Sequence, residues 1–251
     1  MKNKIKFLFT RVSLLFREIP ALTTVCFVLS VVLMNLLANV SLVTVSWLAI
    51  DAGILLSWVS FVVMDIICRR FGATAANILT IFALLVNISI ILLFNIVRWI
   101  ALATPEFNSW LAVGTGSSFL DVMAGDWHVV VSSSIALLAG AFSQNAINVI
   151  IKKALKPGHP VKAFMVASYI STALGQFIDN LVFAIFAHWI FVIWGTPLTL
   201  LQVITFAASQ AIIELLSEVI FSPLGYRIVH KWEQRGVGEA YLSFISSDSR
   251  K

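Results

Sequence analysis

The sequence predicts an all-α membrane protein with six transmembrane helices. Hydrophobic residues make up 60% of the 251 residues and charged residues only 12%, whereas about a quarter of an average soluble domain is charged. The mean hydropathy of +0.98 agrees with this bias. Six apolar stretches are each long enough to cross about 30 Å of hydrocarbon as a helix. These observations exclude an ordinary soluble domain.

The six predicted spans are separated by turn-forming or charged residues. They cover residues 21–43, 49–68, 74–102, 129–151, 161–194 and 198–220. Asp51 and Gly53 indicate a turn between the first two spans, and glycine–proline clusters at 157–160 and 195–197 separate the last three. The third and fifth stretches are longer than the bilayer is thick, so we expect them to tilt or to project beyond it.

The chain divides into three predicted parts. Residues 1–20 form a basic, amphipathic cytoplasmic segment, residues 21–226 the six-helix transmembrane domain, and residues 227–251 a cytoplasmic tail. No small-residue cleavage site follows the first apolar run, so we interpret it as a retained signal anchor. The one long outer connection, residues 105–127, is expected to lie along the surface or to cap a cavity.

The distribution of basic residues predicts the orientation. Loops that stay in the cytoplasm carry an excess of Lys and Arg. If both termini are cytoplasmic, sixteen of the 17 Lys and Arg residues lie inside and only Arg98 lies toward the outer side. An even number of spans is consistent with this arrangement.

Polar residues recur on one face of several predicted spans, because positions three, four or seven apart share a helix face. Lipid cannot satisfy such groups, so they must contact one another or a wet cavity. One reading is interhelical hydrogen bonding that stabilises the bundle, and the other is a binding site. The stripes are Asn35 and Asn39 in the first span, Thr172, Gln176, Asp179, Asn180 and Phe183 in the fifth, and Gln210, Glu214, Ser217, Glu218 and Phe221 in the sixth.

The ionisable residues in the spans have different interpretations. No basic residue lies at the predicted depth of Asp179, so this side chain must be protonated, solvated or ligand-bound. Asp65 precedes Arg69 by one turn, so a helical ion pair and a functional role are both open. Glu214 repels Glu218, one turn away, unless a proton or cation intervenes. His188 falls on the opposite side of the helix from Asp179 and is interpreted as an interfacial histidine.

Motifs of soluble enzyme chemistry are missing from the sequence. It contains no phosphate-binding G-x-x-x-x-G-K-[ST] loop, no H-E-x-x-H pair, no nucleophile elbow and no Cys/His spacing for zinc. We therefore expect a non-enzymatic protein without cofactor, metal or nucleic-acid partner. A small membrane carrier or binding subunit fits the polar stripes better.

Four segments resemble one family, the queuosine precursor transporters, also called vitamin uptake transporters. The run LMNLLANV at 33–40 is similar to the family's first helix, and AGILLSWVSFVVMDIICRRFG at 52–72 to its second, with matches at Asp65 and Gly72. SYISTALGQFIDNLVFAIFAHW at 168–189 resembles its fifth-helix signature, and FSPLGY at 221–226 the end of its last helix. The resemblance extends over about residues 30–232. One departure is Glu214, where the family commonly carries a lysine.

The resemblance implies a fold like the substrate-binding component of energy-coupling-factor vitamin transporters, in the bacterial cytoplasmic (inner) membrane. It also implies import of 7-deazaguanines, namely queuine, 7-cyano-7-deazaguanine or 7-aminomethyl-7-deazaguanine. The resemblance also implies a gating or structural role for Asp65 and Gly72. The expected substrate-binding residues are Asp179, Gln176, Asn180, Asn35, Asn39, Glu214 and Phe183.

Three functional hypotheses follow. The first is a carrier that works alone, with Glu214 receiving a cationic amine of the substrate. The second is a binding subunit that requires an external ATPase module, and the third is a non-transporting membrane assembly protein. Membrane lipids are expected partners in each case, and a homo-oligomer is left open.

Overall fold

The computed structural model describes residues 2–38, 41–45, 48–103, 127–154, 160–192 and 197–248. Within these ranges the chain is helical apart from one short β-ribbon. The elements are α1 (Lys2–Glu18), α2 (Ala21–Leu37), β1 (Ser41–Val45), β2 (Leu48–Asp51), α3 (Ile54–Phe71), α4 (Ala73–Ala103), α7 (Trp127–Ala154), α8 (Pro160–Ala184), the π-helix η1 (Ile185–Ile190), α9 (Leu200–Gln234) and α10 (Glu239–Asp248).

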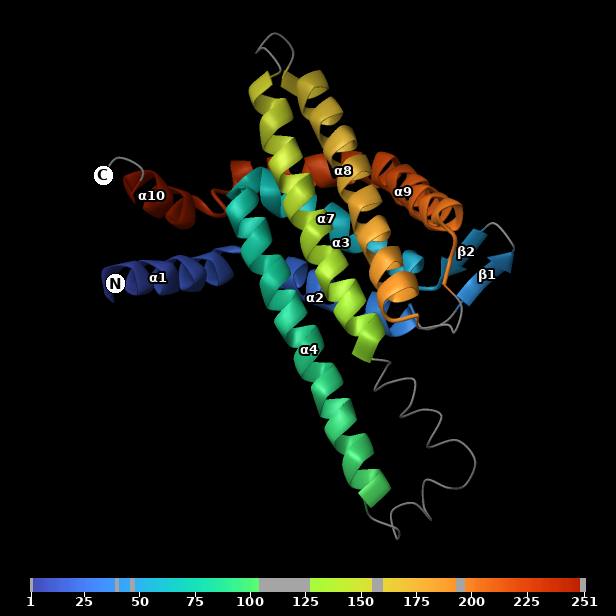
Figure 1. Ribbon diagram of the computed structural model, residues 1–251. Coiled ribbons are helices and arrows are strands. Elements are labelled where there is room, and N and C mark those ends of the chain that lie inside the picture. The colour runs from blue at the N-terminus through green and yellow to red at the C-terminus, as the bar shows by residue number, and fades with distance from the viewer. Residues whose placement is uncertain are drawn as a thin grey trace.

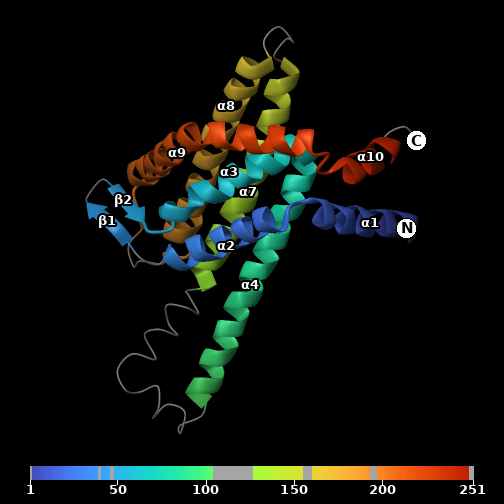
Figure 2. The ribbon, with the colours of Figure 1, turned by 180° about the vertical axis from the view of Figure 1, so that it is seen from behind.

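The helices form two layers that cross each other. Figure 1 shows α4, α7 and α8 running side by side in front, and Figure 2 shows α2, α3 and α9 crossing them on the other side. The helices α1 and α10 project together from one side of this bundle, and the ribbon β1–β2 lies at the opposite side. Side chains at the interface of the two layers are therefore enclosed from both sides.

Among the described residues, four helices are long and apolar enough to cross a membrane. They contain the candidate spans Ala73–Ile100, Trp127–Ile151, Tyr169–Ile190 and Leu200–Gln234. A fifth span is obtained if Ile5–Glu18 and Ala21–Leu37 are counted together, although these two helices are bent by 102°. The described residues thus support a multi-pass membrane protein with four or five spans, and the predicted total of six stays a prediction.

The predicted boundary between the first two spans is wrong. Helix α2 ends at Leu37, and Ser41–Val45 pairs antiparallel with Leu48–Asp51 where helix was predicted up to residue 43 and from residue 49. The sequence SLVTV of β1 is rich in β-branched residues, which favour strands. Helix α3 consequently begins at Ile54. The other predicted turns, at 157–160 and 195–197, and the outer connection lie largely outside the described residues.

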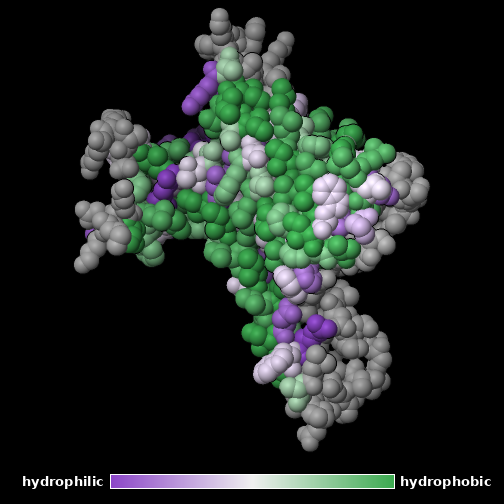
Figure 3. All heavy atoms as spheres, viewed as in Figure 1, coloured by the Kyte–Doolittle hydropathy of each residue, from purple (hydrophilic) through white to green (hydrophobic). Residues whose placement is uncertain are grey.

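The outer surface of α4 is apolar over a length that matches a bilayer. Among the side chains that the structure describes, its exposed large hydrophobic residues extend from Ile81 to Ile100, a stretch of 20 residues or about 30 Å of helix. Leu85, Leu92 and Leu93 are each more than half exposed along it. Figure 3 shows the corresponding hydrophobic surface in green over this layer of helices. This surface is suited to lipid contact.

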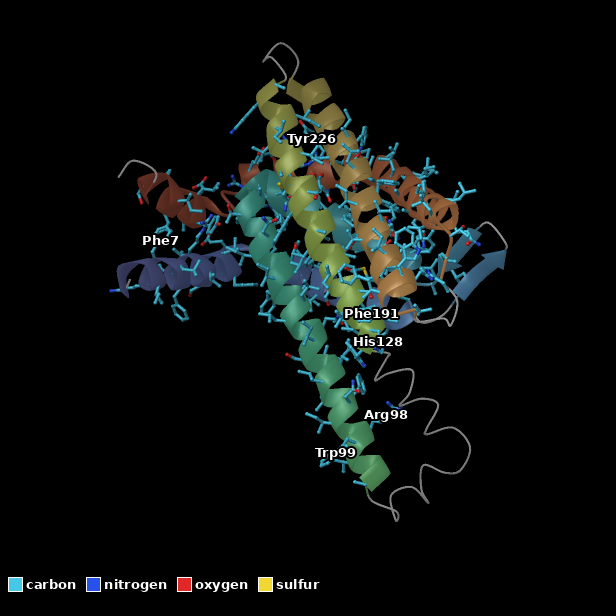
Figure 4. All side chains as sticks on the ribbon, viewed as in Figure 1. Phe7, Arg98, Trp99, His128, Phe191 and Tyr226 are labelled. Atoms are coloured by element: carbon cyan, nitrogen blue, oxygen red, sulfur yellow. The ribbon has the colours of Figure 1, made fainter. Side chains whose placement is uncertain are left out.

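Aromatic residues gather where the spans of the front layer end. The Trp127 ring lies 5.5 Å from that of Phe191, and the His128 ring lies 4.8 Å from Phe191. Trp99, near the end of α4, is 71% exposed. Figure 4 shows His128 and Phe191 together at one end of α7 and α8, with Arg98 and Trp99 at the end of α4. Trp and other amphipathic rings prefer such positions at the membrane–water interface.

A candidate binding cavity between the helix layers

Two glycines bring α7 and α8 into close contact beside the cavity. A Cβ atom added to Gly140 would lie 2.6 Å from the Asp179 Cβ and 3.0 Å from the Gly175 carbonyl oxygen. A Cβ atom added to Gly175 would lie 2.6 Å from the Gln144 Cβ. Both distances are shorter than real Cβ contacts, so only glycine permits this approach. Small residues at helix contacts are typical of membrane bundles.

Side-chain hydrogen bonds fix the register of α8 against α7. The Gln144 amide donates to the Thr172 hydroxyl at 3.1 Å, and the Asn148 amide donates to the Ser171 hydroxyl at 3.1 Å. All four side chains are buried. These bonds and the glycine contact hold α8, and therefore Asp179, in a defined position.

Asn180 connects α8 to α9. Its amide nitrogen donates to the Gln176 backbone oxygen at 2.9 Å and to the Glu214 Oε2 at 3.0 Å. The two bonds use both hydrogens of the amide, so its orientation is fixed. Glu214 is only 4% exposed, and the hydrogen bond from Asn180 compensates part of the cost of burying its carboxylate.

The resulting cavity has a volume of about 60 Å³, which is room for several waters. Both layers contribute to its wall. It is lined by fourteen residues, Met34, Asn35, Ala38, Gly53, Ile54, Ser57, Ser133, Ala136, Leu137, Asp179, Asn180, Phe183, Gln210 and Glu214. Two of these residues are carboxylates, and none of the fourteen is Lys, Arg or His.

Most residues singled out from the sequence meet at this cavity. Asp179, Asn180, Phe183, Glu214 and Asn35 all line it, although they come from three helices. Asp179 is only partly buried, unlike its neighbours Gln176 and Asn180 on the same helix. The structure thus joins the polar stripes of the first, fifth and sixth predicted spans, and the binding role of these residues stays a prediction.

Gln176 and Asn39 stand apart from this group. Gln176 is fully buried but is not among the lining residues, and neither atom of its side-chain amide has a hydrogen-bond partner among the described residues. Asn39 lies outside the described residues.

Asp65 and Gly72 lie away from the cavity lining. Asp65 Oδ2 contacts the Arg69 guanidinium at 2.5 Å, and both side chains are buried, so the predicted ion pair is present. Gly72 has a φ of +91°, a conformation that favours glycine, and its N–H bonds the Cys68 carbonyl at the end of α3. This geometry is consistent with the structural role, and the gating role stays a prediction.

Replacing Arg69 by Gln should lower the thermal stability of the purified protein, because the Asp65 carboxylate would stay buried without this cation. Removing one partner of a buried ion pair costs about 3–5 kcal/mol. The double variant Asp65→Asn/Arg69→Gln should recover much of the loss. Thermal unfolding in detergent measures both, and equal destabilisation by the single and double variants would contradict this account.

The lining residue Ser133 was not singled out from the sequence, and Ser57 was noted only as a polar residue of the second predicted span without being assigned to the site. The Ser133 hydroxyl donates to the Asn35 Oδ1 and so connects α7 to α2 beside the cavity. Serine is common in membrane helices, where it usually bonds its own backbone, as the Ser57 hydroxyl does to the Ile54 carbonyl. For Ser133, the only signal in the sequence was the run of three serines at 132–134.

His188, interpreted from the sequence as an interfacial histidine, has a buried side chain, and its position relative to the membrane interface stays a prediction. The residue is 5% exposed, and its ring lies 6.2 Å from that of Phe206 in an edge-on arrangement. It belongs to η1, where the α-helix of Asp179 changes to a π-helix. A π-helix has more residues per turn than an α-helix, so the angle of 180° counted from Asp179 at 3.6 residues per turn does not apply to His188.

The fold and the cavity define the class: a multi-pass helical membrane protein with a mainly apolar cavity that contains two carboxylates between its helix layers, as expected of a small-molecule transporter. The family model described as "Putative vitamin uptake transporter" matches residues 51–228, from the end of β2 through most of α9. The chain therefore belongs to the vitamin uptake transporter family. No curated protein and no solved structure was found to match it.

Family membership gives the protein a transport role and confirms the resemblance seen in the sequence at the level of the family. The matched segment contains Asp179, Asn180, Phe183 and Glu214, so four of the five predicted site residues at the cavity lie inside it. Helices α1 and α10 lie outside it.

Proposed function

We propose that this protein imports queuosine precursors, the 7-deazaguanines, across the bacterial cytoplasmic membrane, with both chain termini in the cytoplasm. The observation that carries the proposal is the convergence of Asp179, Asn180 and Glu214 on one cavity that also contains Asn35 and Phe183. The family match supports the transport role but is broader than this substrate class.

The chemistry of the lining suits a guanine-like base. The N1–H and the exocyclic amine of such a base are two parallel donors, which one carboxylate accepts together. Asp179 is assigned this role, because it is the less buried of the two carboxylates and so the more available to a ligand. An amide such as Asn35 donates to the carbonyl of the base, and Phe183 offers an aromatic surface to the ring.

The size of the cavity implies a conformational step in transport. An engineered apolar cavity of about 150 Å³ accepts benzene, whereas the present cavity measures about 60 Å³. A bicyclic base therefore requires more space. Since the wall combines residues of both helix layers, separation of α2 and α3 from α7 and α8 is the simplest way to provide it.

In this proposal the protein is a carrier that works alone, without an ATPase module. A binding subunit that depends on an ATPase module and a non-transporting assembly protein are the alternatives. The decisive experiment expresses this chain by itself in a bacterial host that can neither make nor import queuosine precursors and lacks such a module. Each 7-deazaguanine is supplied separately, and queuosine in the tRNA is measured by mass spectrometry.

Modified tRNA in this host would support the lone carrier and would identify the precursor. Modification only after an ATPase module is added would favour the binding subunit. No modification in either case, with the chain present in the membrane, would contradict the proposal.

The carboxylate of Glu214 predicts that the protein selects among 7-deazaguanines by their charge. Glu214 lines the cavity beside Asp179, and none of the fourteen lining residues carries a positive charge. A protonated amine is the natural counter-charge, so 7-aminomethyl-7-deazaguanine and queuine should be preferred over the neutral 7-cyano compound. Replacing Glu214 by Gln removes the charge but keeps the shape and the Asn180 contact.

We expect Glu214→Gln to lower uptake of the aminomethyl compound by roughly tenfold, as the loss of about 1.4 kcal/mol would, and to leave uptake of the cyano compound nearly unchanged. Competition between the two compounds in the same cells measures the ratio. An equal loss for both would indicate a structural role of Glu214, and this would contradict the predicted selectivity.

A further inference from the structure

The helix α1 has three distinct sides. One side packs on α10: the rings of Phe7 and Phe244 stack at 5.1 Å, and Arg11 Nε donates to the Tyr241 hydroxyl at 3.3 Å. Figure 4 shows Phe7 on the side of α1 that faces α10. Tyr241 is fully buried, so the two terminal helices form one packed unit although they lie at opposite ends of the sequence.

A second side of α1 is apolar and exposed. We call Ile5, Leu8 and Phe9 the apolar stripe; they are exposed by 61%, 56% and 76%. The same side continues along the helix to Phe16, which is seven residues after Phe9. An exposed Phe, Leu and Ile together on one face require a partner surface.

The position of the apolar stripe points to lipid as that partner. The Phe16 ring lies 4.7 Å from that of Phe82 in α4. This contact falls where the exposed apolar surface of α4 begins, at Ile81, so the apolar surfaces of α1 and α4 are continuous. Since α1 also bends by 102° away from α2, it runs along the bilayer boundary when α2 enters the bilayer.

The third side of α1 is polar and basic. Lys6, Ser13 and Arg17 are exposed and share one face, because they are seven and four residues apart. Further lysines occupy positions 2 and 4 of the sequence. The partner helix α10 exposes Ser243, Ser246 and Ser247. An apolar side next to a basic one is the pattern of helices that lie in the interface of membranes with anionic lipids.

We propose that the α1–α10 unit is a membrane-surface element, in which the apolar stripe enters the acyl region and Lys6 and Arg17 bind anionic lipid headgroups. This inference is independent of the transported substrate. It assigns a binding role to two helices that lie outside the segment shared with the transporter family.

Spin labelling of the full-length protein in lipid nanodiscs tests the proposal. Single cysteines replace Leu8 on the apolar stripe or Ser13, about 140° away around the helix, as a matched exposed control. The native cysteines are first removed as Cys26→Ser and Cys68→Ala. Collision rates with oxygen, which is concentrated in the bilayer, and with a water-soluble nickel chelate report the surroundings of each label.

We expect the ratio of the oxygen collision rate to the nickel-chelate collision rate to be several-fold higher for the label at position 8 than for the label at position 13. The difference should be larger in an equal mixture of phosphatidylcholine and phosphatidylglycerol than in phosphatidylcholine alone. The variant Lys6→Gln/Arg17→Gln should lose this dependence on the anionic lipid.

Three other outcomes would overturn the proposal in whole or in part. Equal access of the nickel chelate to both labels would place α1 in water. Protection of Leu8 from both reagents would indicate a covering protein, such as a second copy of the chain. If the label at position 8 collides preferentially with oxygen to the same extent with and without phosphatidylglycerol, Lys6 and Arg17 do not bind anionic headgroups.

Discussion

Asp179→Asn should reduce uptake of 7-deazaguanines by about 10- to 100-fold, because leaving buried hydrogen-bond groups unmatched costs about 1–3 kcal/mol. An asparagine amide can accept from only one of the two parallel donors of the base and turns its own N–H groups toward the other. The expected loss is therefore in substrate binding, and the initial rate at low substrate concentration is the quantity to measure.

A matched control separates this effect from a general loss of charge. Glu239→Gln is the same carboxylate-to-amide change at an exposed position of α10, far from the cavity lining. It should leave uptake unchanged at equal amounts of membrane protein. Uptake by Asp179→Asn within about twofold of wild type, a difference of only about 0.4 kcal/mol, would argue against a binding role for Asp179.

Gly140→Leu should abolish uptake and lower the thermal stability of the protein. Even the first carbon of the new side chain would lie 2.6 Å from the Asp179 Cβ and 3.0 Å from the backbone oxygen of Gly175. Neither neighbour is the flexible end of a side chain, so α7 and α8 must move apart. Overpacking of this kind typically costs about 1–3 kcal/mol, and here it also displaces Asp179 from the cavity.

The control for this variant is Ala146→Leu on the outward side of the same helix. Ala146 is exposed, and the larger side chain would meet only the surroundings of the bundle. We expect normal uptake and stability. If Gly140→Leu had the same thermal stability and uptake as Ala146→Leu, the close contact of α7 and α8 would not be what positions Asp179.

The helix periodicity predicted the inner face of α8 well. Thr172, Gln176, Asn180 and Phe183 are all buried, as their common face required. An apolar helix in a membrane can place an amide or carboxylate only where protein or water satisfies it, so one sequence stripe is sufficient evidence for a buried face. The last four spans could also be predicted, because their length and apolarity alone identify them.

Four features were beyond such reasoning because neither hydropathy nor helix periodicity encodes them. The β1–β2 ribbon requires pairing that a hydropathy pattern does not encode, and the π-helical turn before His188 changes the face count within one helix. The close approach at Gly140 is visible in the sequence only as a glycine. Ser133 became a candidate only when α7 was seen to face Asn35 of α2.

The cavity around Asp179 should bind a 7-deazaguanine. Calorimetric titration of the purified wild-type protein with 7-aminomethyl-7-deazaguanine tests it most directly, with Asp179→Asn and Glu239→Gln titrated in parallel. We expect saturable binding by wild type and Glu239→Gln and a loss of at least about tenfold in affinity for Asp179→Asn. Equal binding by all three proteins, or no binding by the folded wild type, would contradict the claim.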